Sequence, residues 1–241
     1  VYTSIIFQDN LYVGTNQGLF YKPYNSNKKL QIVNNTQGQV WCLKIIDNTL
    51  FCGHNSGTFV VKNDSALKIS DFSGTWDIKK VSTNQNILLQ GNYNGLSILE
   101  KVNNNWKFRN KIEGFNISSR FVELINENEL LINHEYDGIF KLKLNSEFTN
   151  IENELKFKPF GVKSSLVAYN DKILHSSSFG VYQYLKSKNT FERDSLLSSL
   201  LYKKEDPIKG NLIVDGKNNL WGFSDRNIVF IKYDAISNKP K

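Results

Sequence analysis

The side chains of this sequence that could do chemistry are few, and they do not form a known catalytic pattern. The histidines are His54, His134 and His175, and a zinc site would need such imidazoles within a few ångströms of one another, with further ligands. Glu127 and Glu129 form a close carboxylate pair among asparagines, whereas general acid–base pairs need one carboxyl whose pKa is shifted by burial. G-x-S-x-G, H-E-x-x-H and P-loop motifs do not occur. We expect no catalytic residue, no metal site and no cofactor.

The side chains best suited to binding are aromatic and amide groups at recurring positions. Trp41 and Trp76 lie 35 residues apart (76 − 41), a spacing that places them at equivalent inner-strand entrances. Aromatic faces with nearby amides suit a sugar ring or an extended peptide, and Arg120 could pair with an acidic group. Packing of each Trp in the core is the alternative, and it stays open. The predicted binding residues are Asn16, Trp41, His54, Asn55, Trp76, Asn92, Tyr93, Arg120, Tyr136 and Arg226.

These positions recur because the chain contains an internal repeat. Leu11–Phe20, Leu50–Phe59 and Leu88–Ser97 share one design, in which apolar residues lead to a glycine and then to a second glycine. The second glycine, replaced by Asn in the last copy, recurs at steps of 39, 38, 43, 42 and 47 residues. Gly and Asn enter left-handed backbone conformations readily, so the position predicts a tight turn. The marker residues are Gly18, Gly57, Gly95, Gly138, Gly180 and Asn227.

Each copy of the repeat divides into short strands. In the second copy we expect strands at Val40–Ile46, Thr49–His54, Thr58–Lys62 and Ala66–Asp71, separated by turn residues. A repeat of this length predicts an all-β fold, a β-propeller of about six four-stranded antiparallel blades. Closure of the ring stays open, because the last copy lacks an obvious fourth strand. Six registered copies argue against an irregular β-sandwich, and the long period argues against a β-solenoid. Ser195–Tyr202 is apolar enough for one or two turns of helix.

The predicted organisation is a single propeller domain over residues 1–233, followed by a tail or linker at 234–241. The predicted blades cover residues 1–36, 37–73, 74–115, 116–160, 161–206 and 207–233.

Composition narrows the classes of partner. The net charge is +7, but the 30 Lys and Arg residues are scattered along the chain, whereas nucleic-acid binders concentrate their charge on one face. We therefore expect no direct binding of nucleic acid. Cys42 and Cys52 could bridge two strands of one hairpin, although two buried thiols are favoured. The chain begins with Val and contains no Met, so we expect a processed chain or an excised domain.

Two copies of the repeat carry a resemblance to a known family. Asp215–Gly222 reads Asp-Gly-Lys-Asn-Asn-Leu-Trp-Gly, and Asp9–Phe20 contains Leu-Tyr-Val-Gly-Thr followed by Gly-Leu. This pattern resembles the two-component regulator propeller repeat, found in periplasmic sensor regions of Bacteroidetes hybrid kinases and related transcriptional regulators. The chain departs from the pattern in two copies, where Asn133-His134 and Ser176-Ser177 replace Gly-Thr.

The resemblance implies an extracytoplasmic ligand-sensing or dimerisation domain of a membrane-anchored signalling or transcriptional regulator. Its partners would be an oligosaccharide or other small ligand, a second copy bound through the propeller, and downstream signalling domains of the same polypeptide. A protein-interaction scaffold is the main alternative, although the Gly-His and Trp-Asp dipeptides of WD-repeat propellers do not recur here from copy to copy and occur once each, at Gly53-His54 and Trp76-Asp77. A propeller enzyme such as a glycosidase, lyase or lactonase is the third hypothesis, and it would require converging carboxylates or a histidine cluster.

Overall fold

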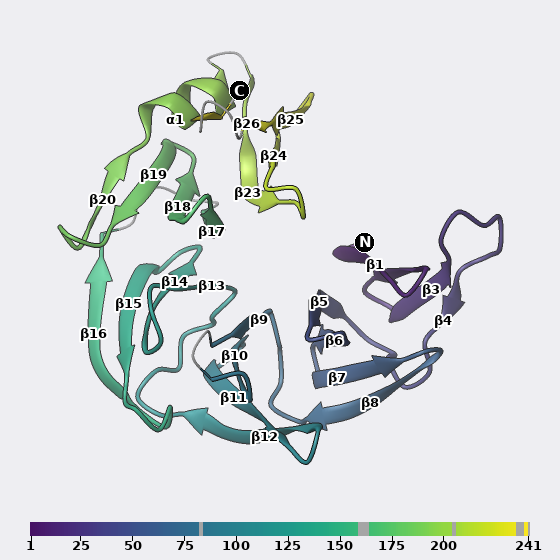
Figure 1. Ribbon diagram of the computed structural model, residues 1–241. Helices are drawn as coiled ribbons and strands as arrows, with labels where there is room; N and C mark the ends of the chain where they lie inside the picture. The colour runs from purple at the N-terminus through teal and green to yellow at the C-terminus, as the bar shows by residue number, and fades with distance from the viewer. Residues whose placement is uncertain (82–83, 159–163, 204–205, 235–238, 241) are drawn as a thin grey trace. The chain divides into compact units, whose positions relative to one another are not determined.

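The regular structure of the chain consists of β-strands and one short helix (Figure 1). The computed structural model describes residues 1–81, 84–158, 164–203, 206–234 and 239–240. Its contacts divide the chain into two compact units: Val1–Arg120 with Leu144–Ile151, and Phe121–Lys143 with Glu152–Lys241. Among the described residues, no helix has the length and apolar character needed to cross a membrane.

The first unit contains three four-stranded antiparallel sheets, each with its strands in sequence order. Many consecutive strands are joined by tight turns, and Asn and Asp occupy left-handed positions at several of them, such as Asp47 and Asn48. The strands are β1 (Thr3–Phe7), β2 (Asn10–Gly14), β3 (Leu19–Pro23), β4 (Gln31–Ile32), β5 (Val40–Ile46), β6 (Thr49–His54), β7 (Gly57–Lys62), β8 (Ser65–Ser70), β9 (Asp77–Lys80), β10 (Ile87–Asn92), β11 (Gly95–Val102) and β12 (Asn105–Ile112).

The second unit contains two further four-stranded sheets, one three-stranded sheet, two short strand pairs and the helix. Its elements are β13 (Phe121–Leu124), β14 (Glu129–His134), β15 (Gly138–Leu144), β16 (Ile151–Phe157), β17 (Ser165–Tyr169), β18 (Lys172–Ser177), β19 (Gly180–Leu185), β20 (Thr190–Arg193), α1 (Ser195–Leu201), β21 (Tyr202–Lys203), β22 (Asp206–Pro207), β23 (Lys209–Val214), β24 (Leu220–Phe223), β25 (Ile228–Ile231), β26 (Tyr233–Asp234) and β27 (Lys239–Pro240).

The predicted fold class, an all-β propeller of four-stranded antiparallel blades, is confirmed. Five sheets have four strands, and the sixth, β23–β25, has three among the described residues. In the second copy, β5 and β6 have the predicted bounds, and β7 and β8 each begin one residue earlier than expected. The predicted helix is also present as α1, where the Asp194 side chain caps the N-terminus by accepting from the Leu197 amide.

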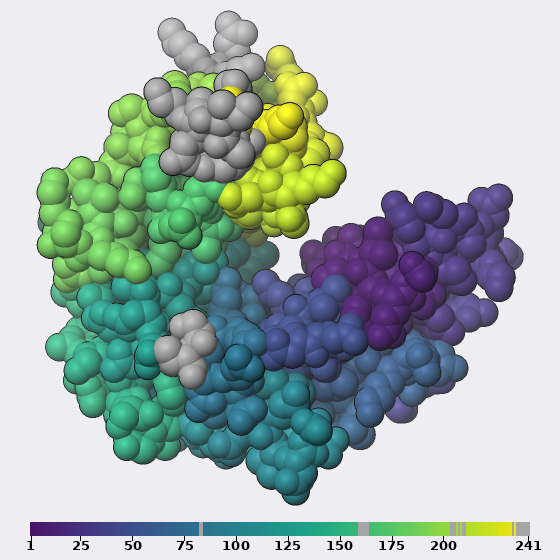
Figure 2. All heavy atoms as spheres, viewed as in Figure 1, coloured from purple at the N-terminus to yellow at the C-terminus, as the bar shows by residue number. Residues whose placement is uncertain are grey.

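The sheets of the first unit pack face to face through their apolar side chains. Leu50 and Cys52 of the second sheet are fully buried in a cluster with Tyr12 of the first. On the opposite face, Phe51 is buried in a cluster with Leu88 of the third sheet. Figure 2 shows the atoms of the first sheet (purple) directly against those of the second (blue). Successive side chains of β6 point to opposite faces of its sheet, so they pack alternately against the first and the third sheet.

The second unit follows the same principle, with the helix as an additional layer. Leu131 of the fourth sheet shares a buried cluster with Leu166 of the fifth. Leu197 and Leu201 of α1 lie in a cluster with Leu220 of the sixth sheet. Full burial of each such side chain is worth about 1.5–3 kcal/mol.

The repeated glycine has a steric reason. Gly57 and Gly95 have φ of 134° and 99°, values that side chains with a Cβ rarely adopt. A Cβ at Gly57 would lie 2.0 Å from the Ser70 carbonyl oxygen, and one at Gly95 would lie 2.1 Å from that of Phe115. The predicted tight turn is therefore also a point where the chain leaving the fourth strand approaches the backbone closely.

The sixth sheet differs from the others in the exposure of one face. Trp221 and Phe230 pair across β24 and β25 and are 37% and 46% exposed. Phe51, at the position of the repeat that corresponds to Trp221, is fully buried. Large apolar side chains gathered on one exposed face are uncommon in soluble proteins. The exposed apolar residues of this sheet are Ile213, Trp221, Phe223, Ile228 and Phe230.

Both cysteines are free and buried, so the prediction of two buried thiols is confirmed. Burial raises the pKa of the Cys42 thiol to about 12, which makes this group unreactive at neutral pH.

Candidate functional site

The most distinctive cluster of the first unit lies where its inner strands begin. Trp41 is the second residue of β5, whereas Tyr2 and Trp76 each directly precede an inner strand. The Tyr2 amide donates to the Gly14 carbonyl at 2.9 Å, and the Trp76 amide donates to the Gly91 carbonyl at 2.8 Å. Tyr2 and Trp76 therefore occupy the same position relative to the second strand of their sheets.

A β-bulge directs the Trp41 side chain. Val40 pairs with His54 and Cys42 pairs with Gly53, so Trp41 is the extra residue between two ladder pairs. An extra residue leaves the ladder locally unpaired and increases the twist, which re-aims the side chain. The bulge thus frees Trp41 from the alternation that buries its neighbours Val40 and Cys42.

These side chains form a continuous row of contacting groups, with neighbouring ring planes tilted by 52° and 35°. We call this row the aromatic stack: Tyr2, Trp41, Trp76 and Arg120. The ring centroids of Tyr2 and Trp41 are 4.9 Å apart, and those of Trp41 and Trp76 are 4.5 Å apart. The Arg120 guanidinium carbon lies 5.2 Å from the Trp76 ring centroid, within the range of a cation–π interaction. Trp41 and Trp76 are partly exposed, and Tyr2 is 52% exposed. Aromatic surface therefore faces outward along the strand entrances.

Tyr93 closes one side of the aromatic stack. Its hydroxyl accepts a 2.7 Å hydrogen bond from Trp41 Nε1, and its ring meets Trp76 edge-on at 5.3 Å. A Cβ at Gly74 would lie 1.9 Å from Tyr93 Cγ, so only glycine lets the ring lie here. Burial raises the pKa of the Tyr93 hydroxyl, and the group is a neutral phenol at physiological pH.

A buried ring of polar side chains supports the stack from beneath. The Thr58 and Thr75 hydroxyls are 2.8 Å apart, and Asn92 Nδ2 donates to Thr75 Oγ1 at 3.1 Å. Ser97 Oγ donates to Asn92 Oδ1 at 2.7 Å and lies 3.2 Å from Gln90 Oε1. Gln90 Nε2 donates back to Thr58 Oγ1 at 2.5 Å. All five side chains are buried, and a fully satisfied network of this kind rigidifies the backbone that carries it. It holds Thr75, the residue directly before Trp76.

The acidic residue that directly follows Trp76 is Asp77, and two lysines neutralise its charge. Asp77 is buried and contacts Lys44 Nζ at 2.9 Å and Lys79 Nζ at 3.3 Å. Burial alone would raise the pKa of the Asp77 carboxyl, but the Lys79 and Lys44 ammonium groups hold it below its ordinary value. Asp77 is therefore a buried carboxylate with two cationic partners.

The predicted binding residues separate into groups. Trp41, Trp76 and Arg120 lie in the stack, and Tyr93 closes one side of it. His54 and Asn92 are buried: the His54 imidazole lies 2.8 Å from Ser56 Oγ and meets Phe59 edge-on. Burial lowers the pKa of His54, so this residue is a neutral core histidine.

The remaining predicted residues are surface groups in turns. Asn55 is partly buried, and its Oδ1 accepts from the Gln39 amide at 3.2 Å. Asn16 is exposed in the first unit, and Tyr136 and Arg226 are exposed in the second. Among the described residues of the first unit, neither Asn16 nor Asn55 belongs to the stack.

Two members of the cluster were not among the predicted residues. Tyr2 stands 12 residues before Gly14, just as Trp41 stands 12 before Gly53 (14 − 2 and 53 − 41), so the spacing of the repeat could have identified it. Ser118 accepts a 3.1 Å hydrogen bond from Trp76 Nε1, and no feature of the sequence indicated this contact.

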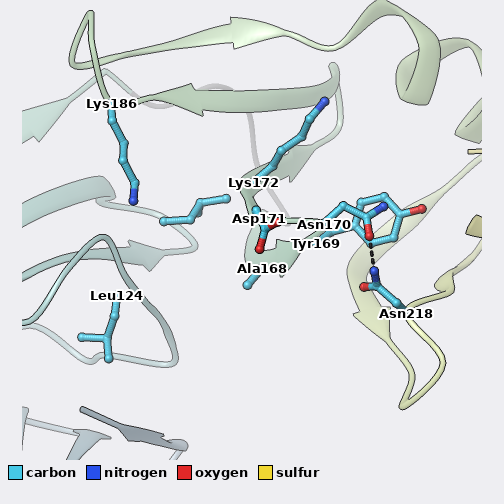
Figure 3. A pocket seen from close by; sticks show the side chains of 9 residues that line it. Leu124, Ala168, Tyr169, Asn170, Asp171, Lys172, Lys186 and Asn218 are labelled. Carbon is cyan, nitrogen blue, oxygen red and sulfur yellow. Dashed lines mark hydrogen bonds between the residues drawn. The ribbon is translucent and has the colours of Figure 1, made fainter. Parts of the chain in front are cut away.

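The second unit contains a separate pocket of about 620 Å³ around the β17–β18 turn (Figure 3). Asn218 Nδ2 donates to Asn170 Oδ1 on one side, and Lys186 Nζ donates to the Ile125 carbonyl at 2.7 Å on the other. Asn170 and Asp171 adopt left-handed conformations typical of a tight hairpin turn. Asn170, Asn218 and Lys186 in this pocket therefore already bond to other parts of the chain.

Comparisons with known proteins show the fold and leave the family open. The sequence matches no family model and no curated protein. Among solved structures, it is similar to the WD40 β-propeller domain of Doa1, with a TM-score of 0.62, 15% identity, and coverage of 92% of this chain and 74% of that one. It is also similar to the extracellular domain of the putative hybrid two-component system BT4673 from B. thetaiotaomicron, with a TM-score of 0.66 and 17% identity. That match covers 98% of this chain but 32% of the other, so the chain spans about a third of that domain.

A third similar structure is the computationally designed Ika8 protein, with a TM-score of 0.64, 11% identity, and coverage of 100% of this chain and 72% of that one. The class that the fold defines is therefore the β-propeller. At these identities the likeness extends to the fold alone.

Proposed function

We propose that this chain is the ligand-recognition domain of a sensory protein and that the aromatic stack is its binding surface. The observation that carries the proposal is the alignment of Tyr2, Trp41 and Trp76 at centroid distances of 4.9 and 4.5 Å with partly exposed edges. Such a surface offers apolar area with polar groups at its margin, which suits the apolar faces of sugar rings. We take an oligosaccharide as the ligand class and binding without turnover as the activity.

The cellular setting belongs to the same proposal. The solved structures with this fold include the extracellular domain of a putative two-component system, and two copies of the repeat resemble sensor propellers of that kind. We propose an extracytoplasmic domain of a membrane-anchored regulator, with downstream signalling domains in the same polypeptide and pairing of two copies on ligand binding. The scaffold alternative has its own structural parallel in the WD40 domain of Doa1.

The decisive experiment is a thermal-shift titration with a panel of neutral and acidic oligosaccharides. A ligand that binds only the folded state stabilises it by about 2.7 kcal/mol at a hundredfold excess over Kd. We expect a saturable rise in Tm for one ligand class, lost in Trp41→Ala and Trp76→Ala. Trp221→Ala is the matched control, because this tryptophan lies in the sixth sheet and outside the stack.

Folding of each variant is checked by circular dichroism before titration, and Trp76→Phe is included as a milder change. A ligand shift that persists in folded Trp41→Ala and Trp76→Ala variants would move the site elsewhere. The absence of any shift across the panel would refute oligosaccharide recognition and favour the scaffold alternative. Chromatography of the incubated oligosaccharides tests the proposal of binding without turnover, since any cleavage product would contradict it.

Pairing of copies is tested by light scattering with and without the ligand found in the titration. A doubled mass only in the presence of ligand is the expected result. A constant monomer mass would remove dimerisation from the proposal, and fractionation of cells that express the full-length protein tests its extracytoplasmic location.

A further inference from the structure

We propose that the free edge of β25, in the sixth sheet, is a docking site for an extended strand of a separate polypeptide. The bound strand would complete this sheet as its fourth strand, a mode of recognition known as β-augmentation. β25 belongs to the second unit and the aromatic stack to the first, so the two sites can be tested separately.

The sixth sheet is one strand shorter than the others. In the described part of the chain its order is β23-β24-β25, whereas the other five sheets have four strands each. In the fifth sheet, for example, the third strand β19 pairs with a fourth strand, β20. An edge strand without such a neighbour presents a row of backbone N–H and C=O groups that another chain can pair with.

The hydrogen-bond pattern of the hairpin shows which backbone groups face the free edge. The Ser224 amide donates to the Asn227 carbonyl at 2.8 Å, and opposite pairs alternate between bonded and non-bonded in an antiparallel ladder. The next bonded residue of β25 is therefore Val229, whose partner is Gly222. Ile228, one residue earlier, directs its N–H and C=O away from β24.

Phe230 has the same orientation as Ile228. It pairs with Trp221 across the hairpin, and the two ring centroids are 4.5 Å apart. Such close side chains are typical of a non-bonded pair, whose backbone groups point outward. Ile228 and Phe230 thus place two donors and two acceptors along the free edge.

A cavity beside this edge has room for the side chains of an added strand. Its volume is about 350 Å³, and it is lined by residues 227–230 of the hairpin and by Leu200 and Leu201 of α1. Leu201 is buried in the cluster that also contains Ile231, so α1 covers the inner face of the sheet and reaches its edge. Side chains of the added strand that point inward would meet this apolar floor.

Side chains that point to the other face of the added strand would also find apolar neighbours. Ile228 is 76% exposed and Phe230 is 46% exposed, and cross-strand pairs of apolar residues stabilise a sheet. The site therefore suits a strand with apolar residues on both faces.

The free edge also decides which kind of partner fits. A helix uses its own N–H and C=O groups internally, so only an extended backbone can pair with those of Ile228 and Phe230. Symmetric pairing of two copies through β25 would bring both α1 helices to the same face of the joined sheet, at the same edge. The two helices would then compete for the same space, whereas a single strand of another polypeptide meets no such obstacle.

The probe is a synthetic peptide of residues 64–71, which contains β8, the fourth strand of the second sheet. It is titrated into the isotope-labelled protein and followed by NMR. We expect the peptide to shift the amide signals of Ile228 and Phe230 and to slow their hydrogen exchange. The control peptide carries prolines in place of Leu67 and Lys68, because proline has no N–H and interrupts the ladder.

Two variants of the protein separate the backbone contribution from that of the side chain. Ile228→Pro removes an outward N–H, at an edge position where proline is tolerated in sheets. Ile228→Ala removes most of the same side chain and keeps the N–H. After circular dichroism has shown that both variants fold, we expect loss of peptide binding in Ile228→Pro and measurable binding in Ile228→Ala.

A fusion keeps the test decisive where the affinity of the free peptide is weak. The sequence of residues 64–71 is appended after Lys241 through a Gly/Ser linker, which raises its effective concentration to about the millimolar range. We expect a higher Tm than in a fusion with the proline-containing sequence, together with protection of the Ile228 and Phe230 amides.

Three results would overturn the proposal. The first is the absence of any shift or protection at Ile228 and Phe230 in both the titration and the fusion. The second is binding that persists in Ile228→Pro or with the proline-containing peptide. The third is a doubled mass in light scattering without peptide, with both amides already protected, since a second copy would then occupy the edge.

Discussion

The two compact units use the same repeat, but they differ in the residues at the entrances to their inner strands. In the first unit Tyr2, Trp41 and Trp76 stand there and stack on one another. In the second unit Ser164 directly precedes β17 and is buried, and its hydroxyl lies 3.0 Å from Asn133 Nδ2. Ser164 has the same backbone position as Tyr2 and Trp76, directly before an inner strand, but its side chain is buried whereas theirs are partly exposed. A repeat determines where a side chain is displayed, whereas the residue placed there decides whether it stays partly exposed or is buried.

The buried polar groups differ in the same way. The first unit has a closed ring of five side chains beneath the stack, from Thr58 to Ser97. The second unit has smaller groups, such as the Ser165 and Ser176 hydroxyls at 2.8 Å. A rigid support is needed where large rings must be held at fixed spacing. This difference agrees with recognition being placed in the first unit.

The largest expected loss of stability tests the contrast between the buried face of the second sheet and the exposed face of the sixth. Phe51→Ala removes a fully buried ring that meets Trp106 edge-on at 5.7 Å, and we expect a loss of about 3–5 kcal/mol. Trp221→Ala, at the corresponding position of the sixth sheet, should cost about 1 kcal/mol or less because the side chain is 37% exposed. Urea unfolding followed by circular dichroism measures both. Equal losses would show that the sixth sheet is covered in solution.

The next effect is a pH dependence that belongs to the second unit. Burial lowers the pKa of His175 from 6.5 to about 4. The unfolded chain therefore binds the proton first as pH falls, so stability is fully present above pH 6.5 and is lost as pH falls towards 4. The full loss is about 3 kcal/mol, because each pKa unit corresponds to about 1.4 kcal/mol.

The measurement is the urea midpoint at several pH values for the wild type and His175→Gln. In His175→Gln, the urea midpoint should fall less steeply as the pH is lowered. His54→Gln should also reduce the acid sensitivity, because burial lowers the pKa of His54 too. An unchanged pH profile in His175→Gln would show that His175 is accessible to protons in the folded state.

A smaller effect tests the polar ring under the stack. Thr75→Val keeps the shape but removes the hydroxyl that joins Thr58 to Asn92, and we expect a loss of about 1–3 kcal/mol from unsatisfied buried groups. Ser165→Ala in the second unit breaks a single hydroxyl pair and should cost about 1 kcal/mol. Urea unfolding measures both, and a larger loss for Ser165→Ala would reverse the comparison.

The smallest effect concerns the hydrogen bond at the edge of the stack. Tyr93→Phe removes the acceptor of the Trp41 indole N–H, and we expect a loss of about 0.5–1.5 kcal/mol. The chemical shift of the Trp41 indole proton should move in the NMR spectrum. Tyr136→Phe is the control, because Tyr136 is 76% exposed. An unmoved Trp41 indole signal would show that this bond is not formed in solution.

Local features of the sequence predicted much of the architecture. The glycine period predicted the turns, and the runs between turn residues predicted β5 and β6 to the residue. Trp41, Trp76 and Arg120 were identified as occupants of inner-strand entrances because they recur at related positions. His54 and Asn92 were predicted at the same face, yet they lie buried, because the loop before Trp76 passes over them: the Thr75 amide donates to the His54 carbonyl at 3.1 Å.

By itself, the sequence determined the all-β class, the repeat and the positions at which side chains would be displayed, since these depend on short-range backbone preferences and alternation. Tertiary structure alone decided that the four side chains of the aromatic stack come together, that both indole N–H groups are used internally, and that Asp77 is neutralised by two lysines. Those facts depend on contacts between residues that are tens of positions apart, and such contacts exist only once neighbouring sheets pack against each other.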